Sequence, residues 1–303
     1  MIRLLAFVTL MGSSLTASAA PAEIPPEAVV VVYNRAVPDS KELADHYARA
    51  RRIPRQNLIG LNLPDTESVS RLVYNAAIRD PLVATFDRNK WWERRRDAGG
   101  LLQPFANRIR FIVCMRGVPF RIERTPETLT ANDKKRKGTT YSPKPDGDEA
   151  SVDAELAVFG VDGYSIKGPL KNPYFKKDLS LAKGMAGLFA VTRIDGSTWS
   201  VCKRMIDHAV AVEKEGLWGM CYLDLARKGT GYELGDQWLE TIATTNAEIG
   251  VPTIIDRNRD TFVTNYPMRA PAIYFGWYAN NCNGPFLAPE FRFPPGAIAV
   301  HLH

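Results

Sequence analysis

The sequence is poor in cysteine and histidine, the two residue types that most often serve as nucleophiles, bases and metal ligands. Its 303 residues contain four cysteines, with no C-x-x-C or other metal-ligand spacing, and four histidines. It also lacks a Gly-rich phosphate loop, a G-x-S-x-G elbow and an H-E-x-x-H motif. These absences argue against P-loop enzymes, α/β-hydrolases and zincins, and we expect neither a cofactor nor a metal.

Long hydrophobic runs are absent as well. The one apolar run near the start, residues 4–11, is too short for a bilayer, which needs about 20 apolar residues. It follows the basic Arg3 and precedes Ala17-Ser-Ala19, which is the pattern of a secretory signal peptide. The sequence therefore predicts a signal peptide over residues 1–19 and an exported protein, periplasmic or extracellular, without a transmembrane segment after cleavage.

Charge of one sign does not dominate either, because 39 basic residues face 33 acidic ones. Basic runs at 49–55, 94–96 and 134–137 could attract nucleic acid or anionic polymers, but no recognition module accompanies them. A solvated surface explains these runs better. The sequence thus argues against a nucleic-acid partner and identifies no other.

What the sequence does contain is an alternation of apolar strand patterns and helical patterns. Strands are predicted at 28–33, 57–62, 108–115, 188–191, 218–223, 253–255, 272–275 and 297–302. Helices are predicted at 40–51 with Ser40 as cap, at 68–86 with a break at Pro81, at 151–158 with Ser151 as cap, at 198–215 with Ser197 as cap, and at 235–249.

This alternation predicts one α/β domain over residues 20–303, with a doubly wound, mainly parallel sheet and helices on both faces. Residues 124–150 are polar and almost free of large apolar side chains, so we expect a mobile insertion there. The chain stops within an apolar strand pattern at His303, which suggests truncation at the C-terminus.

Several polar or aromatic residues follow directly after predicted strands, where the exits of a parallel sheet converge on one rim. They are Asn34, Arg35, Arg116, Arg193, Asp195, Asp224, Trp277 and Tyr278. Arginines at such a rim can bind a carboxylate or phosphate. Arg193 and Asp195 also suit the alternative role of structural turn and ion-pair residues.

The candidates for catalysis are few. Cys282 lies in a polar loop after the strand at 272–275. The other three cysteines lie in apolar segments and have the pattern of buried thiols. The sequence does not decide whether two of the four cysteines form a disulfide. A thiolate needs a base, and His301 and His303 share one face of a strand. The same two histidines could ligate a metal, but no third ligand is evident.

With these motifs in view, the chain resembles a family of exported bacterial proteins that carry a domain of unknown function. The matching segments are 31–35, 38–40, 53–58, 116–119, 151–156, 193–196, 274–278 and 295–303. More distantly, the order of elements is similar to gingipain-type cysteine peptidases, which implies a caspase-like three-layer α/β sandwich. In that group a strand ending in His-Gly supplies the base and a Cys ends the next strand. Here Gly276-Trp277-Tyr278 stands in place of the His-Gly, and His301 and His303 stand in place of the Cys.

The leading hypothesis is therefore an exported binding or scaffolding domain on a peptidase-like fold that lacks the usual dyad. The alternative is a hydrolase with a divergent constellation drawn from Cys282, His301, His303 or Asp195, or with residues beyond His303. The aromatic pair Trp277 and Tyr278 suggests a binding lip at the rim.

Overall fold

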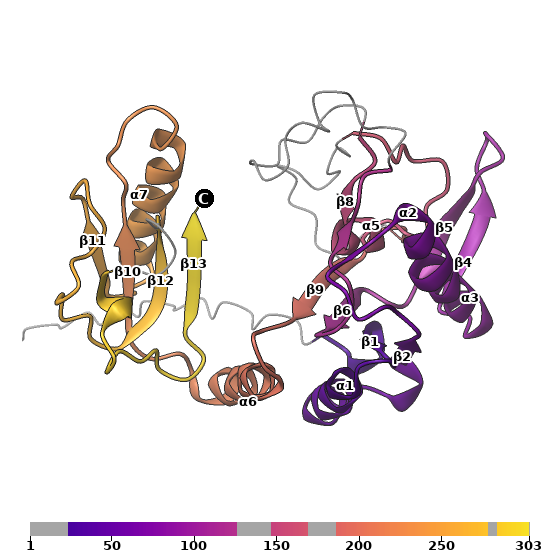
Figure 1. The fold of residues 1–303 in the computed structure, drawn as a ribbon, viewed down its shortest axis with the longest axis horizontal. Coiled ribbons are helices and arrows are strands. Elements are labelled where there is room, and N and C mark those ends of the chain that lie inside the picture. Colours follow the sequence, from indigo (N-terminus) through magenta and orange to yellow (C-terminus); the bar gives the residue numbers. More distant parts are fainter. Residues whose placement is uncertain (1–23, 126–146, 169–185, 278–283, 303) are drawn as a thin grey trace, which may run out of the picture.

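The computed structural model describes residues 24–125, 147–168, 186–277 and 284–302. The predicted signal peptide lies outside these residues, as does most of the predicted insertion at 124–150. The described chain is a mixed α/β protein whose main strands form two parallel sheets of four strands each (Figure 1). The α/β class and the mainly parallel pairing are confirmed, but two sheets take the place of the single sheet that we predicted.

The first sheet has the strand order β2-β1-β6-β9, and all of its pairings are parallel. Its strands are β1 (Val29–Asn34), β2 (Leu58–Leu61), β6 (Phe111–Met115) and β9 (Ala190–Ile194). β1 lies inside the sheet, and its four valines are all buried. Burial on both faces is the reason that this strand is a continuous β-branched run rather than an alternating one.

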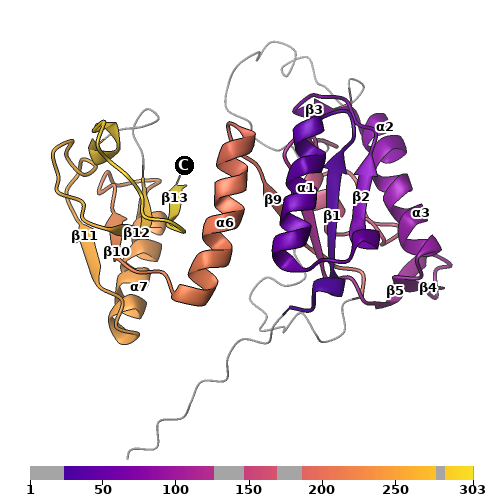
Figure 2. The ribbon, with the colours of Figure 1, turned by 90° about the horizontal axis from the view of Figure 1, so that it is seen from below.

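Helices cover both faces of the first sheet (Figure 2). On one face, α1 (Pro38–Arg51) and α6 (Trp199–Glu215) pack with Val29 and Val31. On the other face lies one continuous helical segment made of α2 (Arg71–Val73), the π-helical η3 (Tyr74–Arg79) and α3 (Asp80–Arg88). This is the three-layer arrangement that doubly wound folds use to bury both faces of a sheet.

Two details of these helices differ from the prediction. Ser40 does not cap α1; it is buried, and its Oγ accepts a hydrogen bond from the backbone N–H of Asn34 over 3.0 Å. Pro81 does not break the helical segment, because it follows the wider π-helical turn and stands in the first turn of α3. Proline lacks a backbone N–H, and its ring collides with the preceding turn of a regular helix. The wider π-helical turn before Pro81 accommodates both effects, so the helical segment continues.

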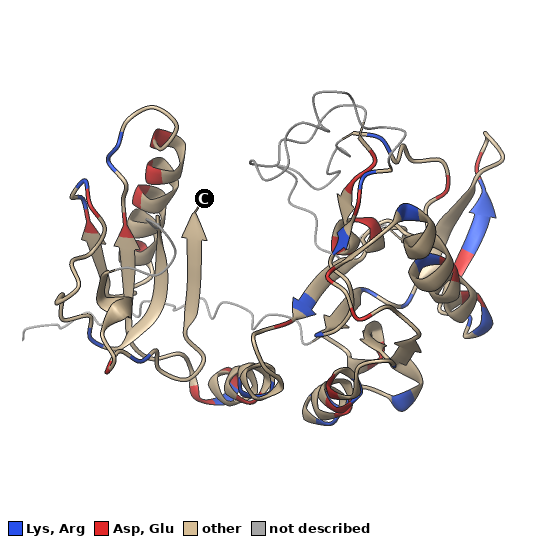
Figure 3. Ribbon diagram, viewed as in Figure 1, with Lys and Arg blue, Asp and Glu red and all other residues tan. Residues whose placement is uncertain are grey.

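Small additional sheets flank the first sheet. β3 (Ser68–Val69), β7 (Arg121–Ile122) and β8 (Ala150–Ser151) form one, and β8 leads into α5 (Val152–Leu156), where Ser151 caps as predicted. β4 (Trp92–Arg96) and β5 (Leu102–Asn107) form an antiparallel hairpin that the polar sequence did not indicate. The buried Trp92 packs among aromatic rings and so anchors this hairpin. The arginines of the hairpin lie on its outer strand, which is blue in Figure 3.

The second sheet repeats the strand order of the first, β11-β10-β12-β13, again all parallel. Its strands are β10 (Met220–Asp224), β11 (Thr253–Asp256), β12 (Pro271–Trp277) and β13 (Ile298–Leu302). In both sheets the first strand pairs with the second on one side and with the third on the other. No internal repeat in the sequence indicated this correspondence.

A helix covers only one face of the second sheet among the described residues. α7 (Glu233–Glu248) packs there against Leu223 and Ile255. The opposite face is covered by Phe262, Tyr266 and Phe286 from the loops after β11 and β12, the last in the short helix η5 (Gly284–Leu287). Loops in place of a second helical layer leave space at this face, which becomes important for the site.

The division into two sheets corrects the prediction of one continuous sheet. β9 is the last strand of the first sheet, and β10 pairs only with β11 and β12. Between them, α6 packs on α1 and lies between the two sheets in both views (Figures 1 and 2). Alternating strand and helix patterns are the same for one sheet or two, so the sequence could not distinguish them. None of the described helices has the length and apolar character needed to cross a membrane.

Candidate functional site

The residues predicted to share one rim lie at the carboxyl edges of two different sheets. Asn34, Arg35, Arg116, Arg193 and Asp195 belong to the edge of the first sheet. Asp224, Trp277 and His301 belong to the edge of the second sheet. Tyr278, Cys282 and His303 lie outside the described residues. Strand exits converge within a sheet, so the two edges are considered in turn.

Asn34 links the loops at the carboxyl edge of the first sheet. It is fully buried at the end of β1, and its Nδ2 donates to the backbone oxygens of Gly117 and Pro64 over 2.9 and 3.3 Å. Its Oδ1 accepts from the backbone N–H groups of Ala36 and Leu63 over 3.0 and 3.2 Å. These bonds join the segments that follow β1, β2 and β6. Asn34 therefore has a structural role.

Arg193 also has a structural role. Its guanidinium binds Asp153 through two bonds, Nε to Oδ2 over 3.1 Å and Nη2 to Oδ1 over 2.6 Å. The same group donates to the backbone oxygens of Val118 and Pro119. A guanidinium whose donors meet a carboxylate and two carbonyls has little capacity left for a ligand. The ion-pair alternative for Arg193 is thus the one that the geometry supports.

Arg116 and Asp195 hold the turn between β9 and α6. Arg116 Nε donates to the backbone oxygen of Gly196 over 3.1 Å, and Asp195 Oδ1 accepts from the N–H of the same glycine over 2.8 Å. Arg35 is exposed, and its backbone N–H bonds to Leu61. The turn role that we held open for Asp195 is the one observed.

Asp224 is the buried acid of the second edge. It ends β10 with 1% of its surface exposed, and its Oδ2 accepts from the N–H of Phe262 over 3.3 Å and from the hydroxyl of Tyr274 over 3.1 Å. Its Oδ1 has no hydrogen-bond partner in the described part of the chain. Burial raises the pKa of Asp224 from 3.8 to about 7 despite these two bonds. An acid of this kind is a marker of functional sites.

Gly276 provides the space for this arrangement. A Cβ on Gly276 would lie 2.5 Å from the Cβ of Asp224 and 2.6 Å from the hydroxyl of Tyr274. The ring of Tyr274 in turn meets the ring of His301 edge to face, with 5.4 Å between centroids. Burial lowers the pKa of His301. Asp224, Tyr274 and His301 thus form a line across three neighbouring strands, β10, β12 and β13.

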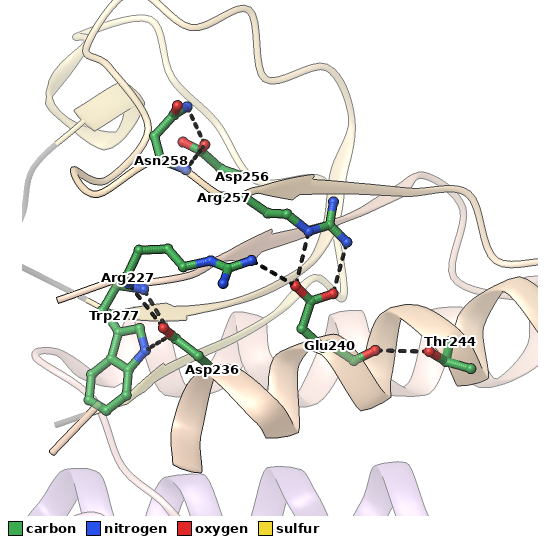
Figure 4. Close-up of polar contacts among 9 residues, drawn as sticks. Arg227, Asp236, Glu240, Thr244, Asp256, Arg257, Asn258 and Trp277 are labelled. Carbon is green, nitrogen blue, oxygen red and sulfur yellow. Dashed lines mark hydrogen bonds and ion pairs between the residues drawn. The ribbon is translucent and has the colours of Figure 1, made fainter. Parts of the chain in front are cut away.

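Trp277 packs on the opposite face of the second sheet, toward α7, and is held in place rather than presented as a lip. Its indole Nε1 donates to Asp236 Oδ1 over 2.8 Å (Figure 4). Its ring packs edge-on against Tyr232. Asp236 also accepts from the backbone N–H groups of Ala226 and Arg227, both over 2.9 Å. The contacts of Trp277 fasten the end of β12 to the start of α7 and to the loop after β10.

A cavity of about 400 Å³ opens next to Asp224, at the exit of β11. Its lining consists of Ile254, Ile255, Asp256, Asn258, Asp260, Thr261, Phe262, Val263 and Tyr266. Asp256 pairs in register with Asp224, and the ends of β10 and β11 are both acidic in Figure 3. Aliphatic and aromatic walls combined with two carboxylates suit a small ligand that carries positive charge.

Two arginines next to this cavity, Arg227 and Arg257, are engaged elsewhere. Arg257 binds Glu240 on α7 through Nε and Nη2, over 2.9 and 2.8 Å, and Arg227 binds the same carboxylate over 3.2 Å (Figure 4). The two guanidinium groups are therefore drawn toward α7. Asp256 makes its hydrogen bonds with Asn258 instead. Arg259, between Asn258 and Asp260, makes no ion pair with another described residue, so the loop at the cavity carries charges of both signs.

Cysteine and metal chemistry find little support among the described residues. Cys114, Cys202 and Cys221 are buried free thiols, as their apolar surroundings in the sequence indicated. Burial raises the pKa of Cys114 to about 12, so this thiol is inert. In the part of the chain that the structure describes, no three His, Cys, Asp or Glu side chains gather around a metal position.

Sequence reasoning found Asp224, Trp277 and His301 but missed the cavity residues Asp256, Asn258 and Asp260. Their signal was a D-x-N-x-D spacing directly after a strand. The sequence gave no indication of Asp236 or Tyr274, because their hydrogen-bond partners Trp277 and Asp224 lie 41 and 50 residues away along the chain. Comparison with known proteins found no matching family model, no matching curated protein and no matching solved structure.

Proposed function

We propose that the protein is an exported binding domain whose ligand site is the cavity at the carboxyl edge of the second sheet. The observation that carries this proposal is the acid-lined cavity of about 400 Å³ beside Asp224. Open parallel sheets bind ligands outside the carboxyl ends of their strands, next to the point where the strand order reverses. In the second sheet that point lies between β10 and β12, where Asp224 pairs with Gly276, and the cavity lies one strand away, at the exit of β11.

The comparison between the two edges supports this choice. Asn34 occupies the end of the first strand in the first sheet, with its amide oxygen and nitrogen bonded to the surrounding backbone. Asp224 occupies the same place in the second sheet and keeps one oxygen without a partner among the described residues. A buried polar atom without a partner costs stability, about 1–3 kcal/mol, and a ligand that bonds to it would remove this cost.

The chemistry of the cavity favours a small, positively charged ligand. Asp256 and Asp260 supply negative charge, and Phe262 and Tyr266 supply aromatic faces that attract cations. Neither Asp256 nor Asp260 forms an ion pair with another described residue. Glu240 binds both Arg227 and Arg257, which draws these two guanidinium groups toward α7 and away from Asp256 and Asp260.

The export and the scaffold are parts of the same proposal. Export rests on the signal-peptide pattern of residues 1–19. The peptidase-like scaffold rests on the order of sequence motifs and is supported by the second sheet, where the ends of β12 and β13 are neighbours, with Gly276 paired to His301. The division into two sheets counts against one caspase-like sandwich, so the likeness is confined to the second sheet.

A thermal-shift titration of the full chain tests the binding function. Spermidine, choline and arginine methyl ester serve as cationic probes, with glutamate as an anionic control. The wild type should gain thermal stability with at least one cation, and Val263→Trp, which fills the exposed mouth of the cavity, should not. Leu72→Trp, an exposed change on α2, is the matched control and should behave as the wild type. Equal shifts in both variants would overturn the proposal.

A second candidate function is hydrolysis, and one observation favours it. Asp224, with a pKa near 7 and a bond to Tyr274, has the properties of a general base, and His301 lies beyond Tyr274. The purified chain can be screened against peptide, ester and phosphate substrates. Turnover that Asp224→Asn abolishes, with the fold intact by circular dichroism, would establish this alternative. A thiol-directed probe that labels Cys282 only when His301 is present would establish a Cys–His version.

A further inference from the structure

The hairpin of β4 and β5 concentrates positive charge at one end of the molecule. Residues 88–110 carry seven basic side chains and two acidic ones, a net charge of +5 in a chain whose net charge is +6. The basic residues are Arg88, Lys90, Arg94, Arg95, Arg96, Arg108 and Arg110. The outer strand of the hairpin and the end of α3 are blue in Figure 3, on the side of the molecule away from the second sheet (Figures 1 and 2).

The acidic side chains of this region are already engaged. Glu93 lies 3.5 Å from Arg95, and Asp87, in the last turn of α3, lies 2.7 Å from Arg94. Asp97 accepts hydrogen bonds from neutral donors of the hairpin, among them two backbone N–H groups of its turn. Each of the two ion pairs balances one basic group, so most of the positive charge is left over.

Five basic side chains have no ion pair with another residue that the structure describes. They are Arg88, Lys90, Arg96, Arg108 and Arg110. All but Arg110, which is half-buried, are exposed. Basic side chains gathered at one surface raise the local potential and attract an anionic partner.

Exposed apolar side chains lie among these charges. Phe105 on β5 is 60% exposed, and Leu101 in the turn of the hairpin is 43% exposed. The guanidinium of Arg95 stacks on the ring of Phe105, with 3.5 Å between its carbon and the ring centroid. The sequence alone favoured a solvated face for the run 94–96, and the structure adds apolar groups beside it. A partner that suits this surface offers apolar contact next to negative charge.

The stacked pair favours a membrane over a nucleic acid. Proteins that bind single-stranded nucleic acid stack its bases on exposed aromatic faces. Arg95 occupies a face of Phe105, so a base cannot stack there. An anionic membrane provides negative headgroups for the arginines and, just beneath them, an apolar boundary for Phe105 and Leu101.

The hairpin is also fixed firmly enough to present this surface. Trp92 of β4 is 6% exposed, and its ring lies 4.8 Å from that of Phe86 and 5.2 Å from that of Phe159. Arg94 covers the same indole ring from the solvent side, 5.0 Å from its centroid. The core thus holds β4 while the side chains of Arg95 and Arg96 face solvent.

We propose that the β4–β5 hairpin docks the protein on a membrane that contains anionic lipids. The basic side chains lie against the lipid phosphates, and Phe105 and Leu101 enter the boundary between headgroups and acyl chains. This interaction goes beyond the proposed ligand site, which lies on the second sheet, and either proposal can fail without the other.

Sedimentation of the full chain with lipid vesicles tests the proposal. Phosphatidylcholine vesicles with about one third phosphatidylglycerol should carry the wild type into the pellet, and pure phosphatidylcholine vesicles should not. Arg95→Gln combined with Arg96→Gln should weaken binding at least about tenfold, since each basic residue near an anionic surface contributes about fivefold. Phe105→Ala should weaken it about threefold or more, because an apolar group no longer enters the boundary.

The matched control is Arg49→Gln combined with Arg55→Gln. Both residues are exposed and belong to another basic run, so this variant loses the same charge and should sediment as the wild type does. A membrane surface attracts charges only within about a Debye length, which is why a change outside the hairpin has little effect.

Three results would overturn the proposal. The first is a wild type that does not sediment with anionic vesicles. The second is equal loss of binding in the two double variants, with both folded by circular dichroism, because overall charge and not the hairpin would then be responsible. The third is binding to DNA in a gel-shift assay that is tighter than binding to anionic vesicles, with both unchanged in Phe105→Ala. In that case the hairpin is a site for nucleic acid.

Discussion

Asn34 and Asp224 hold the same position in two sheets of identical strand order, each as the buried last residue of the sheet's first strand. Asn34 makes four side-chain hydrogen bonds with the segments that leave β1, β2 and β6. Asp224 makes two, and its Oδ1 has no partner among the described residues. At the first edge, the amide of Asn34 satisfies the hydrogen-bonding groups around it. At the second edge, Asp224 is a buried acid, and a charge in a buried position is energetically unfavourable.

The buried acid should make the stability of the protein depend on pH. An acid whose pKa is raised on folding is bound to its proton more tightly in the folded chain, so the wild type is most stable below about pH 4 with respect to this group. Its contribution declines as the pH rises and is fully lost above about pH 7. Asp224→Asn removes this titration. The free energy of unfolding of the variant, relative to the wild type, should increase by up to about 4 kcal/mol between pH 4 and pH 8.

Urea denaturation at a series of pH values measures this difference. Asp65→Asn, exposed in a loop of the first sheet, is the control and should show a nearly constant difference from the wild type. A difference between Asp224→Asn and the wild type that does not change with pH would contradict the raised pKa of Asp224.

Asp236 should be essential for the stability of the second edge. It accepts from the N–H groups of Ala226 and Arg227 and from the indole of Trp277. Asp236→Ala leaves three donors without their acceptor and should lower the free energy of unfolding by about 2–4 kcal/mol. Glu233→Ala, exposed in the same first turn of α7, should change it by less than about 0.5 kcal/mol. Similar small effects of both changes in urea melts would show that Trp277 is not fastened as described.

The buried ion pair of Arg71 and Glu155 should couple α2 to α5. Arg71 Nη1 lies 2.8 Å from Glu155 Oε1, both side chains are less than 10% exposed, and Tyr164 donates to Glu155 Oε2 over 2.6 Å. Glu155→Gln leaves a buried guanidinium without its counter-charge and should cost about 3–5 kcal/mol in unfolding free energy. The surface counterpart Glu240→Gln should cost less than about 1 kcal/mol.

A double-mutant cycle identifies the coupling in this pair. Arg71→Met combined with Glu155→Leu should destabilise the chain much less than the sum of the two single changes, because the double variant leaves no unpaired charge. Additive effects would indicate that the two side chains act independently, contrary to the described contact.

Much of the fold was readable because its strands are buried on both faces. The valine run of β1 and the apolar run of β12 were predicted within two residues of their observed bounds, as were most other strands of the two sheets. Local capping was partly readable. Ser151 caps α5 as expected, whereas α6 is capped by Thr198 rather than by Ser197. These features depend on neighbours in sequence, which is why patterns indicate them.

Features that depend on distant partners were not readable. The hairpin of β4 and β5 has no apolar alternation, since Trp92 alone anchors it in the core. The same strand and helix pattern fits one sheet or two, so only the structure separates the edge of Asn34 from that of Asp224. For the site, position after a strand identified Asp224, but it could not distinguish a fastened Trp277 from an exposed one.

The central claim, that the ligand site lies at the edge of the second sheet, is tested most directly by hydrogen–deuterium exchange with mass spectrometry. The full chain would be compared with and without the organic cation that stabilises it most. Exchange should slow in residues 254–266, around the cavity. It should stay unchanged in residues 34–37 and 116–119, at the first edge. Slower exchange at the first edge, with residues 254–266 unchanged, would contradict the account.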